Sequence, residues 1–497
     1  MDLMELLYSL VDTMEKDRAA LYVRGGTTVF GMPFKRGQFL DFTTYFNGFS
    51  WRKWQRYTAL DAFDVRLRVR GRFLLTGYSV DRKERRILWQ DEVAGDYCRR
   101  VSLSELGGDL FGFSLLSMDD GSVIEEGAYY GRFEECRAIR VGIAICTFQR
   151  EAYVQRTMEV LREFRKTHSW LDVLVVDNGQ TLPPEDNDGV RVIPNRNFGG
   201  SGGFARGLVE YVERGNVDYV LLMDDDIVLE PSAIERFYSL ACHLQPEYRE
   251  SFISGAMLDM DAPTRQVENS AYRGRIFLHP VGQGYLLSDE AALCKNEQIV
   301  ARGNRYAAWW FCGIPVHVVQ RIGYPLPVFI KQDDVEYGMR NGKEILTLNG
   351  MGVWHEAFGK KQSAITDYFT DRNTIIVHHY TAGCGRWTFL LLLFGCLARR
   401  CLQGNLVGLQ GFSLSLRDYA AGFEGITSVG ADEKFASVRE ELGQGAQNAV
   451  GLISSSLGQM VRQFLAYPRM HEAYLRFRKE QLAGPQFWRR YLGLDDE

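Results

Sequence analysis

The sequence predicts an α/β domain with a mostly parallel sheet, preceded by an antiparallel β-sandwich and followed by a helical region. Between residues 140 and 226, apolar strand-like runs alternate with helical segments, which is typical of a parallel sheet. Before this part, FDVRLRVR (63–70) alternates apolar and charged residues with a period of two, as a half-buried strand does. After about residue 380 the pattern is helical, so the 497 residues divide into three parts.

The first part covers residues 1–137. We predict that it opens with an amphipathic helix, because Leu3, Leu7, Leu10, Val11 and Met14 recur at helical spacing. Short apolar runs broken by glycine predict sandwich strands at 21–23, 28–32, 72–80 and 85–90. A cluster of aromatic residues fits either the sandwich core, which is the commoner use, or a carbohydrate-binding face. It consists of Tyr45, Phe46, Phe49, Trp51, Trp54 and Tyr57.

The second part covers residues 138–383. We predict strands at 140–148, 170–179, 191–195 and 217–226, and helices at 151–166 and 202–215. Ligands of such sheets bind at the carboxyl ends of the strands. Polar side chains gather at these ends, namely Thr147, Arg150, Asp177, Asn178 and Asp224 to Asp226.

The third part, residues 384–497, is predicted to be helical. Its longest apolar run, from Trp387 to Ala398, has twelve residues, whereas a membrane-spanning helix needs about 20. Residues 462–490 carry seven basic and two acidic side chains, with aromatic residues interleaved. This pattern suits either an anionic membrane surface or a helical bundle with a solvated basic face.

Composition excludes several classes of protein. The net charge of −5 lacks the basic excess of a nucleic-acid binder, so we expect no nucleic-acid partner. The nine cysteines include no CxxC pair, which argues against a disulfide framework or a zinc knuckle and favours a reducing compartment. Asp2 and Glu5 stand where a secretory signal would carry basic residues. The predicted location is therefore cytoplasmic, with peripheral contact to the cytoplasmic face of the cell membrane as an extension.

Three consecutive carboxylates, Asp224, Asp225 and Asp226, end an apolar strand and give the strongest chemical signal. Such groups repel one another, and a divalent cation relieves the repulsion. Asp224 and Asp226 are spaced to reach one Mg²⁺ or Mn²⁺ ion, which in turn would neutralise a pyrophosphate. The alternative is a solvated acidic turn. His355 on its own fits a core histidine, but as a third ligand it would suit Mn²⁺.

Two further motifs carry chemistry. The segment from Gly199 to Gly203 has four glycines in five positions just before a helix, which suits close backbone approach to phosphate or sugar oxygens. It lacks the GK[ST] of a Walker A loop, and a flexible loop is the alternative. In the adjacent pair Asp333–Asp334, one carboxylate would act as a base while the other holds a partner, unless both are surface acids. Trp309 and Trp310 fit either the core or a sugar-stacking platform.

Together these motifs resemble a known family. Residues 139–380 are similar to glycosyltransferase family 2, the inverting GT-A fold, and within it to the polymerising galactofuranosyltransferases. The matching strings, in order, are TFQR (147–150), NRNFGGSGGFAR (195–206), MDDDI (223–227), WWFCGIP (309–315), PLPVFIKQDD (325–334), VWHEAF (353–358) and DYFTDRN (367–373). The flanking β-sandwich and helical region also resemble these enzymes, although this chain is shorter at its C-terminal end.

The resemblance implies a role for each matching residue. Asp224, Asp226 and His355 would hold Mn²⁺ or Mg²⁺, Asp333 would hold an acceptor hydroxyl, and Asp334 would be the catalytic base. The candidate contacts of the donor nucleotide and its sugar are Thr147, Arg150, Asp177, Asn197 and Asp225. The candidate contacts on the sugar and acceptor side are Gly200, Ser201, Gly202, Trp309 and Trp310.

The resemblance implies transfer of galactofuranose from UDP-galactofuranose to a hydroxyl of a glycan acceptor, which we expect to be lipid-linked. It also implies a homo-oligomer. Three positions depart from the family pattern and leave the acceptor open. Gln332 and Phe358 stand where tryptophan is expected, and Thr370 stands where histidine is expected. The alternatives are another nucleotide sugar such as a rhamnosyl donor, a sugar-binding protein with an inactive transferase domain, and a metal-dependent phosphohydrolase.

Overall fold

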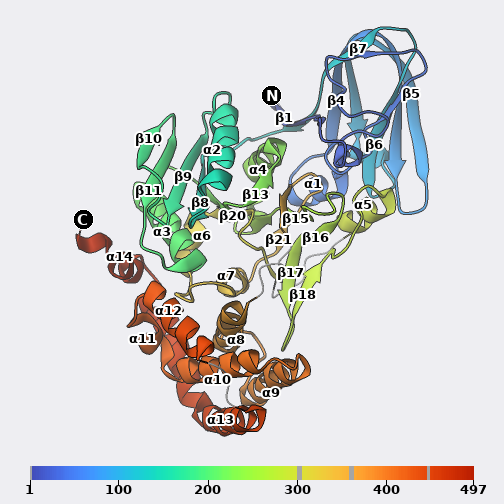
Figure 1. Ribbon diagram of the computed structural model, residues 1–497. Coiled ribbons are helices and arrows are strands. Elements are labelled where there is room, and N and C mark those ends of the chain that lie inside the picture. Colours follow the sequence, from blue (N-terminus) through green and yellow to red (C-terminus); the bar gives the residue numbers. More distant parts are fainter. Residues whose placement is uncertain (1–2, 299–304, 357–362, 445–447, 497) are drawn as a thin grey trace.

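The computed structural model describes residues 3–298, 305–356, 363–444 and 448–496. Three layers follow one another along the molecule (Figure 1). An N-terminal β-sheet domain lies at one end, an α/β layer lies in the middle, and helices from α8 onward form the other end. The nine cysteines are all free thiols.

The N-terminal domain is one antiparallel sheet with the order β1-β7-β4-β6-β3, in which β5 also pairs with β4 and β2 with β7. The strands are β1 (Leu3–Ser9), β2 (Pro33–Phe34), β3 (Phe39–Asp41), β4 (Ala62–Val80), β5 (Arg85–Ser102), β6 (Leu110–Ser117) and β7 (Ser122–Phe133). Strand β4 pairs with β7 through its first half, residues 63–70, and with β6 through its second half, residues 73–80. The expected strand at 21–23 is instead the end of a short 3-10 helix (Ala19–Leu21) and the turn after it, and the expected strand at 28–32 has only an isolated bridge at Phe30.

The aromatic cluster of residues 45–57 is core. All six of its side chains are buried, three of them on or beside helix α1 (Trp51–Tyr57). Phe49 stacks on Phe63 of β4 with ring centroids 4.2 Å apart, and the Tyr45 hydroxyl donates to the Met351 carbonyl of the α/β layer. The cluster therefore joins the two domains and offers no exposed face to a carbohydrate.

The predicted N-terminal helix is wrong, because residues 3–9 form strand β1. This strand pairs with the edge of β7 in an antiparallel register that shifts between Leu6 and Tyr8. On its other side it contacts helix α4 (Pro231–His243), where the Ser9 amide donates to Glu235 and Ser239 donates to the Leu6 carbonyl. Hydrogen bonds from two partners thus outweigh the local helical periodicity.

The central sheet is mixed rather than parallel throughout. Its order is β10-β11-β9-β8-β12-β20-β14-β21, and the four strands β11, β9, β8 and β12 are mutually parallel, as the alternating pattern predicts. These are β8 (Val141–Thr147), β9 (Leu171–Asp177), β11 (Val190–Pro194) and β12 (Tyr219–Asp224), with β10 (Glu185–Asn187) at the edge. Beyond β12, β20 (Cys312–Pro315) runs antiparallel to both of its neighbours, β12 and β14 (Phe252–Ser254). Strand β21 (Ile345–Leu346) closes the sheet and pairs with β14 in parallel.

Helices cover this sheet, and two small sheets lie beside it. The helices of this layer are α2 (Glu151–Arg165), α3 (Gly199–Arg214), α4, α6 (Val316–Ile322) and α7 (Asp333–Asn341), whereas α5 (Glu290–Glu297) contacts β6 of the N-terminal domain. The second sheet joins β13 (Ile227–Leu229), β22 (Gly352–His355), β15 (Ala256–Asp259) and β16 (Gln266–Glu268). The third joins β18 (Leu278–Val281), β17 (Ser270–Arg273) and β19 (Arg305–Tyr306).

The C-terminal region is helical, as predicted. It contains α8 (Ala364–His378), α9 (Arg386–Leu402), α10 (Leu406–Ala420), α11 (Gly422–Thr427), α12 (Ala431–Gly443), α13 (Ala449–Gln481) and α14 (Gln486–Leu492). The Tyr368 hydroxyl of α8 bonds to Asp418 of α10, and Asp371 of α8 pairs with Arg400 of α9 at 2.9 Å. Helix α8 therefore packs with the helices that follow it, although the expected border lies after it, at 383/384.

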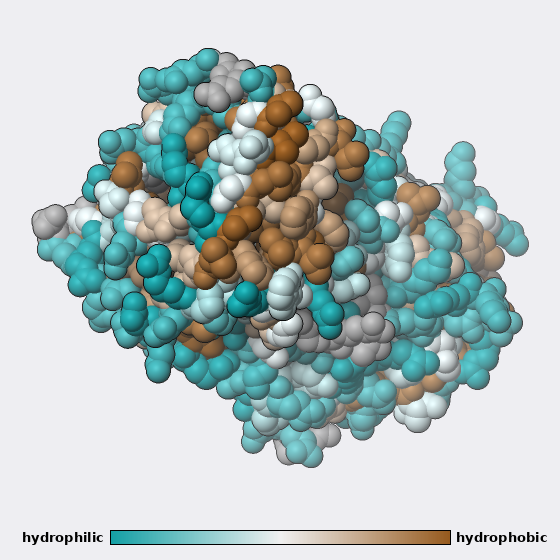
Figure 2. Space-filling view, turned by 90° about the horizontal axis from the view of Figure 1, so that it is seen from below, coloured by the Kyte–Doolittle hydropathy of each residue, from teal (hydrophilic) through white to brown (hydrophobic). Residues whose placement is uncertain are grey.

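The aromatic residues interleaved with the basic stretch 462–490 largely face inward, since Tyr467, Tyr474 and Trp488 are buried. Exposed apolar side chains occur instead on α9 and on the outer face of α13, as the band in Figure 2 shows from that side. They include Trp387, Leu391, Phe394, Val461 and Leu465. The exposed Phe277 of the β17–β18 turn lies close to Gly395 of α9 and extends this set. We call this set the apolar face. Within the described residues, no helix combines the length and the apolarity needed to cross a bilayer.

Strand β1 should contribute strongly to stability. Leu7→Ala should lower the free energy of unfolding by about 2–5 kcal/mol, because a fully buried leucine leaves a cavity when it is truncated. The neighbouring Leu6 is 38% exposed, so Leu6→Ala should cost less than about 1 kcal/mol. Urea unfolding followed by tryptophan fluorescence measures both. Equal losses for the two variants would contradict this placement of the strand.

Candidate active site

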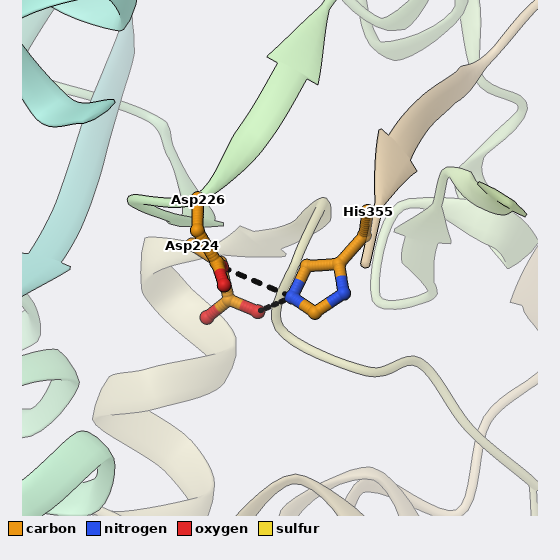
Figure 3. Close-up of side chains that lie close together, drawn as sticks. All are labelled: Asp224, Asp226 and His355. Atoms are coloured by element: carbon orange, nitrogen blue, oxygen red, sulfur yellow. Dashed lines mark ion pairs between the residues drawn. The ribbon is translucent and has the colours of Figure 1, made fainter. Parts of the chain in front are cut away.

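The acidic triplet and His355 meet because the strand that follows the triplet pairs with the strand that ends at His355. Asp224 is the last residue of β12, and Asp225 and Asp226 turn the chain into β13. Strand β13 pairs with β22 so that Ile227 lies opposite His355. The His355 Nε2 atom is 3.0 Å from Asp226 Oδ1 and 3.6 Å from Asp224 Oδ2 (Figure 3). One ligand atom from each of the three residues lies within 4.8 Å of the other two.

The orientation of the imidazole fits a metal ligand. His355 Nδ1 is 2.7 Å from the Glu356 carbonyl oxygen. A carbonyl only accepts hydrogen bonds, so Nδ1 carries the proton in the neutral ring and the Nε2 lone pair faces two carboxylates. This contact is repulsive unless a cation or a proton lies between the groups. Two carboxylate oxygens and one imidazole nitrogen are a donor set that Mn²⁺ accepts readily and Mg²⁺ less so.

Arg150 and Thr147 hold the middle carboxylate of the triplet. The Thr147 hydroxyl donates to Asp225 Oδ2 at 2.8 Å, and Arg150 Nη1 lies 3.1 Å from Asp225 Oδ1 and 2.6 Å from Asp226 Oδ2. Burial raises the pKa of Asp225 to about 6, while Arg150 and the Thr147 hydroxyl act in the opposite direction. Arg150 thus places a positive charge beside the predicted metal site, where a pyrophosphate would need it.

A cavity of about 580 Å³ opens beside the triplet and contains most of the predicted residues. Its lining includes all three metal candidates, Arg150, Asp225, Gly200, Trp309, Trp310, Asp333 and Asp334. The Asp pair begins helix α7, where the Val335 amide donates to Asp334 Oδ1 at 2.7 Å. The structure therefore brings the predicted base and the predicted metal ligands to one cavity.

Burial raises the pKa of both carboxyls in the Asp pair. For Asp333 the charge of Asp334 adds to the effect of burial. For Asp334 the charge of Asp224 adds to it, while the Val335 amide and Lys331 act in the opposite direction. A carboxyl group whose pKa is raised towards neutral pH is suited to accept a proton from a substrate hydroxyl.

A second cavity of about 450 Å³ adjoins the first and shares Arg150, Gly200, Asp225 and Ile330 with it. Its lining also includes Thr147 and Asn197, both predicted nucleotide contacts, and the half-exposed Phe148. The Asn197 amide donates to Asp432 Oδ1 of α12 at 2.6 Å. Asp432 and Phe435 thus extend this cavity with side chains from the C-terminal region.

The glycine-rich segment is not a loop before a helix, because residues 199–203 form the first turn of α3. Gly200 lines both cavities, whereas Ser201, Gly202 and Gly203 are buried and line neither. A Cβ atom on Gly203 would lie 2.1 Å from Cys146 Sγ, and one on Gly202 would lie 2.3 Å from the Phe198 Cβ. The glycines therefore let α3 pack closely against β8 and its own N-terminus.

Other predicted residues sit differently from their expected roles. Asp177 is buried, and its carboxylate accepts hydrogen bonds from the amides of Gly179, Thr181 and Leu182, so it shapes the loop after β9 and lines neither cavity. Trp309 and Trp310 line the first cavity but are only 5% and 4% exposed, and Trp310 Nε1 donates to the Gly255 carbonyl. They are therefore almost fully covered and offer no open stacking face.

Of the three departures from the family pattern, Thr370 lines the first cavity and Gln332 caps α7. Phe358 lies outside the described residues.

The residues that sequence reasoning missed come mainly from the helical region. Thr366, Asp367 and Arg399 line the first cavity, and Asp432 and Phe435 line the second. The string DYFTDRN (367–373) could have pointed to the cavity residues of α8, because it matches the family pattern. No motif in the sequence identifies Arg399 or Asp432 as cavity residues.

Comparisons with known proteins show what this chain is similar to. Residues 139–367 match the model of the glycosyltransferase-like family 2. The galactofuranosyltransferase GlfT2 of Mycolicibacterium smegmatis is 25% identical over 78% of this chain and 65% of its own length. GlfT2 of Mycobacterium tuberculosis is 28% identical over 68% of this chain and 58% of its own length. The chain thus matches about three fifths of the length of these relatives.

Among solved structures, residues 1–349 of S. aureus TarS in complex with UDP share 11% identity with this chain. The match covers 67% of this chain and 92% of that chain, with a TM-score of 0.35. The mannosyltransferase PcManGT of Pyrobaculum calidifontis, in complex with GDP-Man and Mn²⁺, shares 13% identity over 68% of this chain and 86% of that chain. Its TM-score is 0.33.

Removing one carboxylate of the triplet should abolish cation binding. Asp226→Asn should weaken Mn²⁺ binding by about 100-fold or more, since losing even an outer partner of a metal ligand costs about 10- to 100-fold. Calorimetric titration with MnCl₂, with and without UDP, measures this affinity. Asp367→Asn is the matched control, because Asp367 lines the same cavity outside the three-residue cluster. Unchanged Mn²⁺ affinity in Asp226→Asn would count against the site.

Proposed function

Because this chain carries a family 2 glycosyltransferase domain that resembles GlfT2, we propose that it transfers galactofuranose from UDP-galactofuranose to a hydroxyl of a glycan acceptor. The observation that carries the proposal is the single cavity shared by Asp224, Asp226, His355 and Asp334. A cation site and a half-buried carboxylate facing one space are suited to a single displacement at a sugar carbon.

In this proposal the donor nucleotide lies in the second cavity and its sugar reaches into the first. Arg150 and Asp225 line both cavities, so they stand at the passage between them. Arg150 binds the pyrophosphate and stabilises the charge that develops as UDP leaves. A divalent cation held by Asp224, Asp226 and His355 would supply Lewis-acid stabilisation of the same charge.

Asp334 accepts the proton of the acceptor hydroxyl while that oxygen attacks the anomeric carbon from the face opposite UDP. Asp333, one residue away, is the candidate hydrogen-bond partner that orients the acceptor. One carboxylate acts as base and none is needed as a nucleophile, so the configuration at the anomeric carbon inverts. Trp309 and Trp310, both almost fully buried, form part of the apolar wall on the acceptor side.

The deciding experiment is product analysis by mass spectrometry. The chain is incubated with Mn²⁺, a short galactofuranose acceptor and a panel of nucleotide sugars that includes UDP-galactofuranose and a rhamnosyl donor. We expect the acceptor to gain units of galactofuranose. Asp334→Asn should lower turnover by about 10²- to 10⁴-fold, because general-base catalysis is lost. UDP affinity should change little, since the base does not line the second cavity. Transfer from another donor alone would overturn the sugar assignment.

The pH dependence of turnover gives a separate check of the base. The pKa of Asp334 is raised, so the carboxyl is protonated, and inactive as a base, over a wider acidic range than an ordinary aspartate. The acid limb of kcat should therefore lie above the ordinary range of about pH 4, with turnover rising as pH increases through it. A limb at or below that range would argue for a different base.

We also propose that the apolar face binds a membrane surface and so brings a lipid-linked acceptor to the cavity. Trp387, Leu391 and Phe394 lie on one side of α9, and Arg399 of the same helix lines the first cavity. Exposed arginines flank the face at 386, 462 and 469. An aromatic and aliphatic surface with a basic rim is suited to an anionic interface.

Vesicle binding tests the apolar face. Leu391→Glu should weaken sedimentation with phosphatidylglycerol-containing vesicles by about tenfold or more, because it replaces an apolar contact of about 1.5–3 kcal/mol with a charge. Met14→Glu is the control, since Met14 is also exposed (83%, against 57% for Leu391) but lies in the N-terminal domain. If Leu391→Glu instead changes the oligomeric state and leaves vesicle binding intact, the face is an interface between copies of the chain.

A further inference from the structure

The segment that leads into the Asp pair has an unusual backbone. Phe329, Lys331 and Gln332 have φ values of 73°, 66° and 71°, in the left-handed region that residues with a Cβ atom rarely adopt. The Ile330 amide donates to the Val328 carbonyl at 3.1 Å, which closes a tight turn around Phe329. No glycine relieves this segment, so other contacts must hold it in place.

Those contacts come from two buried residues of α8. The Asn373 side-chain nitrogen lies 3.0, 2.7 and 3.0 Å from the carbonyl oxygens of Val328, Ile330 and Lys331. Arg372 Nη2 donates to the Val328 carbonyl at 2.8 Å, and Arg372 Nε donates to Asn373 Oδ1 at 2.9 Å. Arg372 therefore fixes which way the Asn373 amide faces. Both side chains are almost completely buried.

The held segment forms a wall of both cavities. Phe329 lines the second cavity, Lys331 lines the first, and Ile330 lines both. The Phe329 carbonyl accepts the Ser201 amide from the first turn of α3, so the segment is tied to the glycine-rich helix as well. Gln332, the last left-handed residue, is the N-cap of α7, and its carbonyl accepts the Glu336 amide. The direction in which α7 presents Asp333 and Asp334 thus depends on this backbone.

We propose that Arg372 and Asn373 are positioning residues that hold the backbone of residues 328–332, with Phe329, Lys331 and Gln332 in the left-handed region, and thereby aim the Asp333–Asp334 pair into the cavity. The inference rests on the proposed role of Asp334 for its effect on turnover, but the clamp itself is independent of that role. Arg372 and Asn373 end the DYFTDRN string, and neither of them lines a cavity. Contact with a substrate therefore does not explain their presence, whereas positioning of residues 328–332 does.

The test removes the donor groups of Asn373. Asn373→Ala should raise amide hydrogen exchange in peptides covering 326–336 and leave exchange in β8 and β12 unchanged. It should lower kcat by about 10- to 100-fold, since a small displacement of a catalytic group has effects of this size. UDP affinity and the KM for the donor should stay within about twofold of the parent, because the nucleotide contacts remain.

A second substitution separates positioning from general damage. Glycine adopts positive φ without a Cβ clash, so Gln332→Gly in the Asn373→Ala background should recover at least about threefold in kcat. Asn47→Ala is the matched control, because the buried Asn47 amide also donates to backbone carbonyls, those of Val11 and Tyr22, away from the cavities. It should raise exchange near those residues and leave kcat unchanged.

The outcomes distinguish the clamp from the proposed function. If the parent chain transfers no sugar, the function fails, and the exchange experiment still decides on the clamp. Unchanged exchange at 326–336 in Asn373→Ala would overturn the clamp. So would exchange that rises throughout the molecule, or a kcat that falls together with UDP affinity and is not recovered by Gln332→Gly.

Discussion

The site depends on one electrostatic conflict. The β13–β22 pairing sets His355 against Asp224 and Asp226, and the Glu356 carbonyl turns the imidazole so that its lone pair faces the two carboxylates. Three electron-rich atoms in a largely buried place are stable only around a positive charge. Arg150 supplies one positive charge beside the triplet, since its guanidinium lies 3.1 Å from Asp225 and 2.6 Å from Asp226.

The helical region is part of the site and not an appendage to it. Helix α8 supplies both the wall of the first cavity and the hydrogen bonds that hold residues 328–332. Helix α12 places Asp432 against Asn197 at the second cavity. Arg399 of α9 reaches the first cavity from the helix that also carries the apolar face. The lining of both cavities therefore comes jointly from the α/β layer and the C-terminal helices.

The N-terminal domain shows how tertiary contacts change a local preference. Leu3, Leu7 and Leu10 recur at helical spacing, yet the segment is a strand because β7 offers backbone partners on one side and α4 on the other. The interleaved aromatics of 462–490 are a similar case. Tyr467, Tyr474 and Trp488 face the bundle, and the exposed apolar side chains lie on α9 and on the outer face of α13. Spacing along a helix does not say which face will be covered.

The sequence by itself determined the parallel core of the central sheet, the helical C-terminal region and the identity of the chemical groups. Buried strands followed by polar ends are local patterns, so β8, β9, β11 and β12 and the acidic triplet were predictable. Only the tertiary structure decided which predicted residues face the cavities. Asp177 and Ser201 turn inward because backbone amides and close packing use them, and Arg399, Asp432 and Asn373 gain roles through contacts between segments far apart in the chain. Such contacts depend on how layers pack against one another, and no local spacing encodes that.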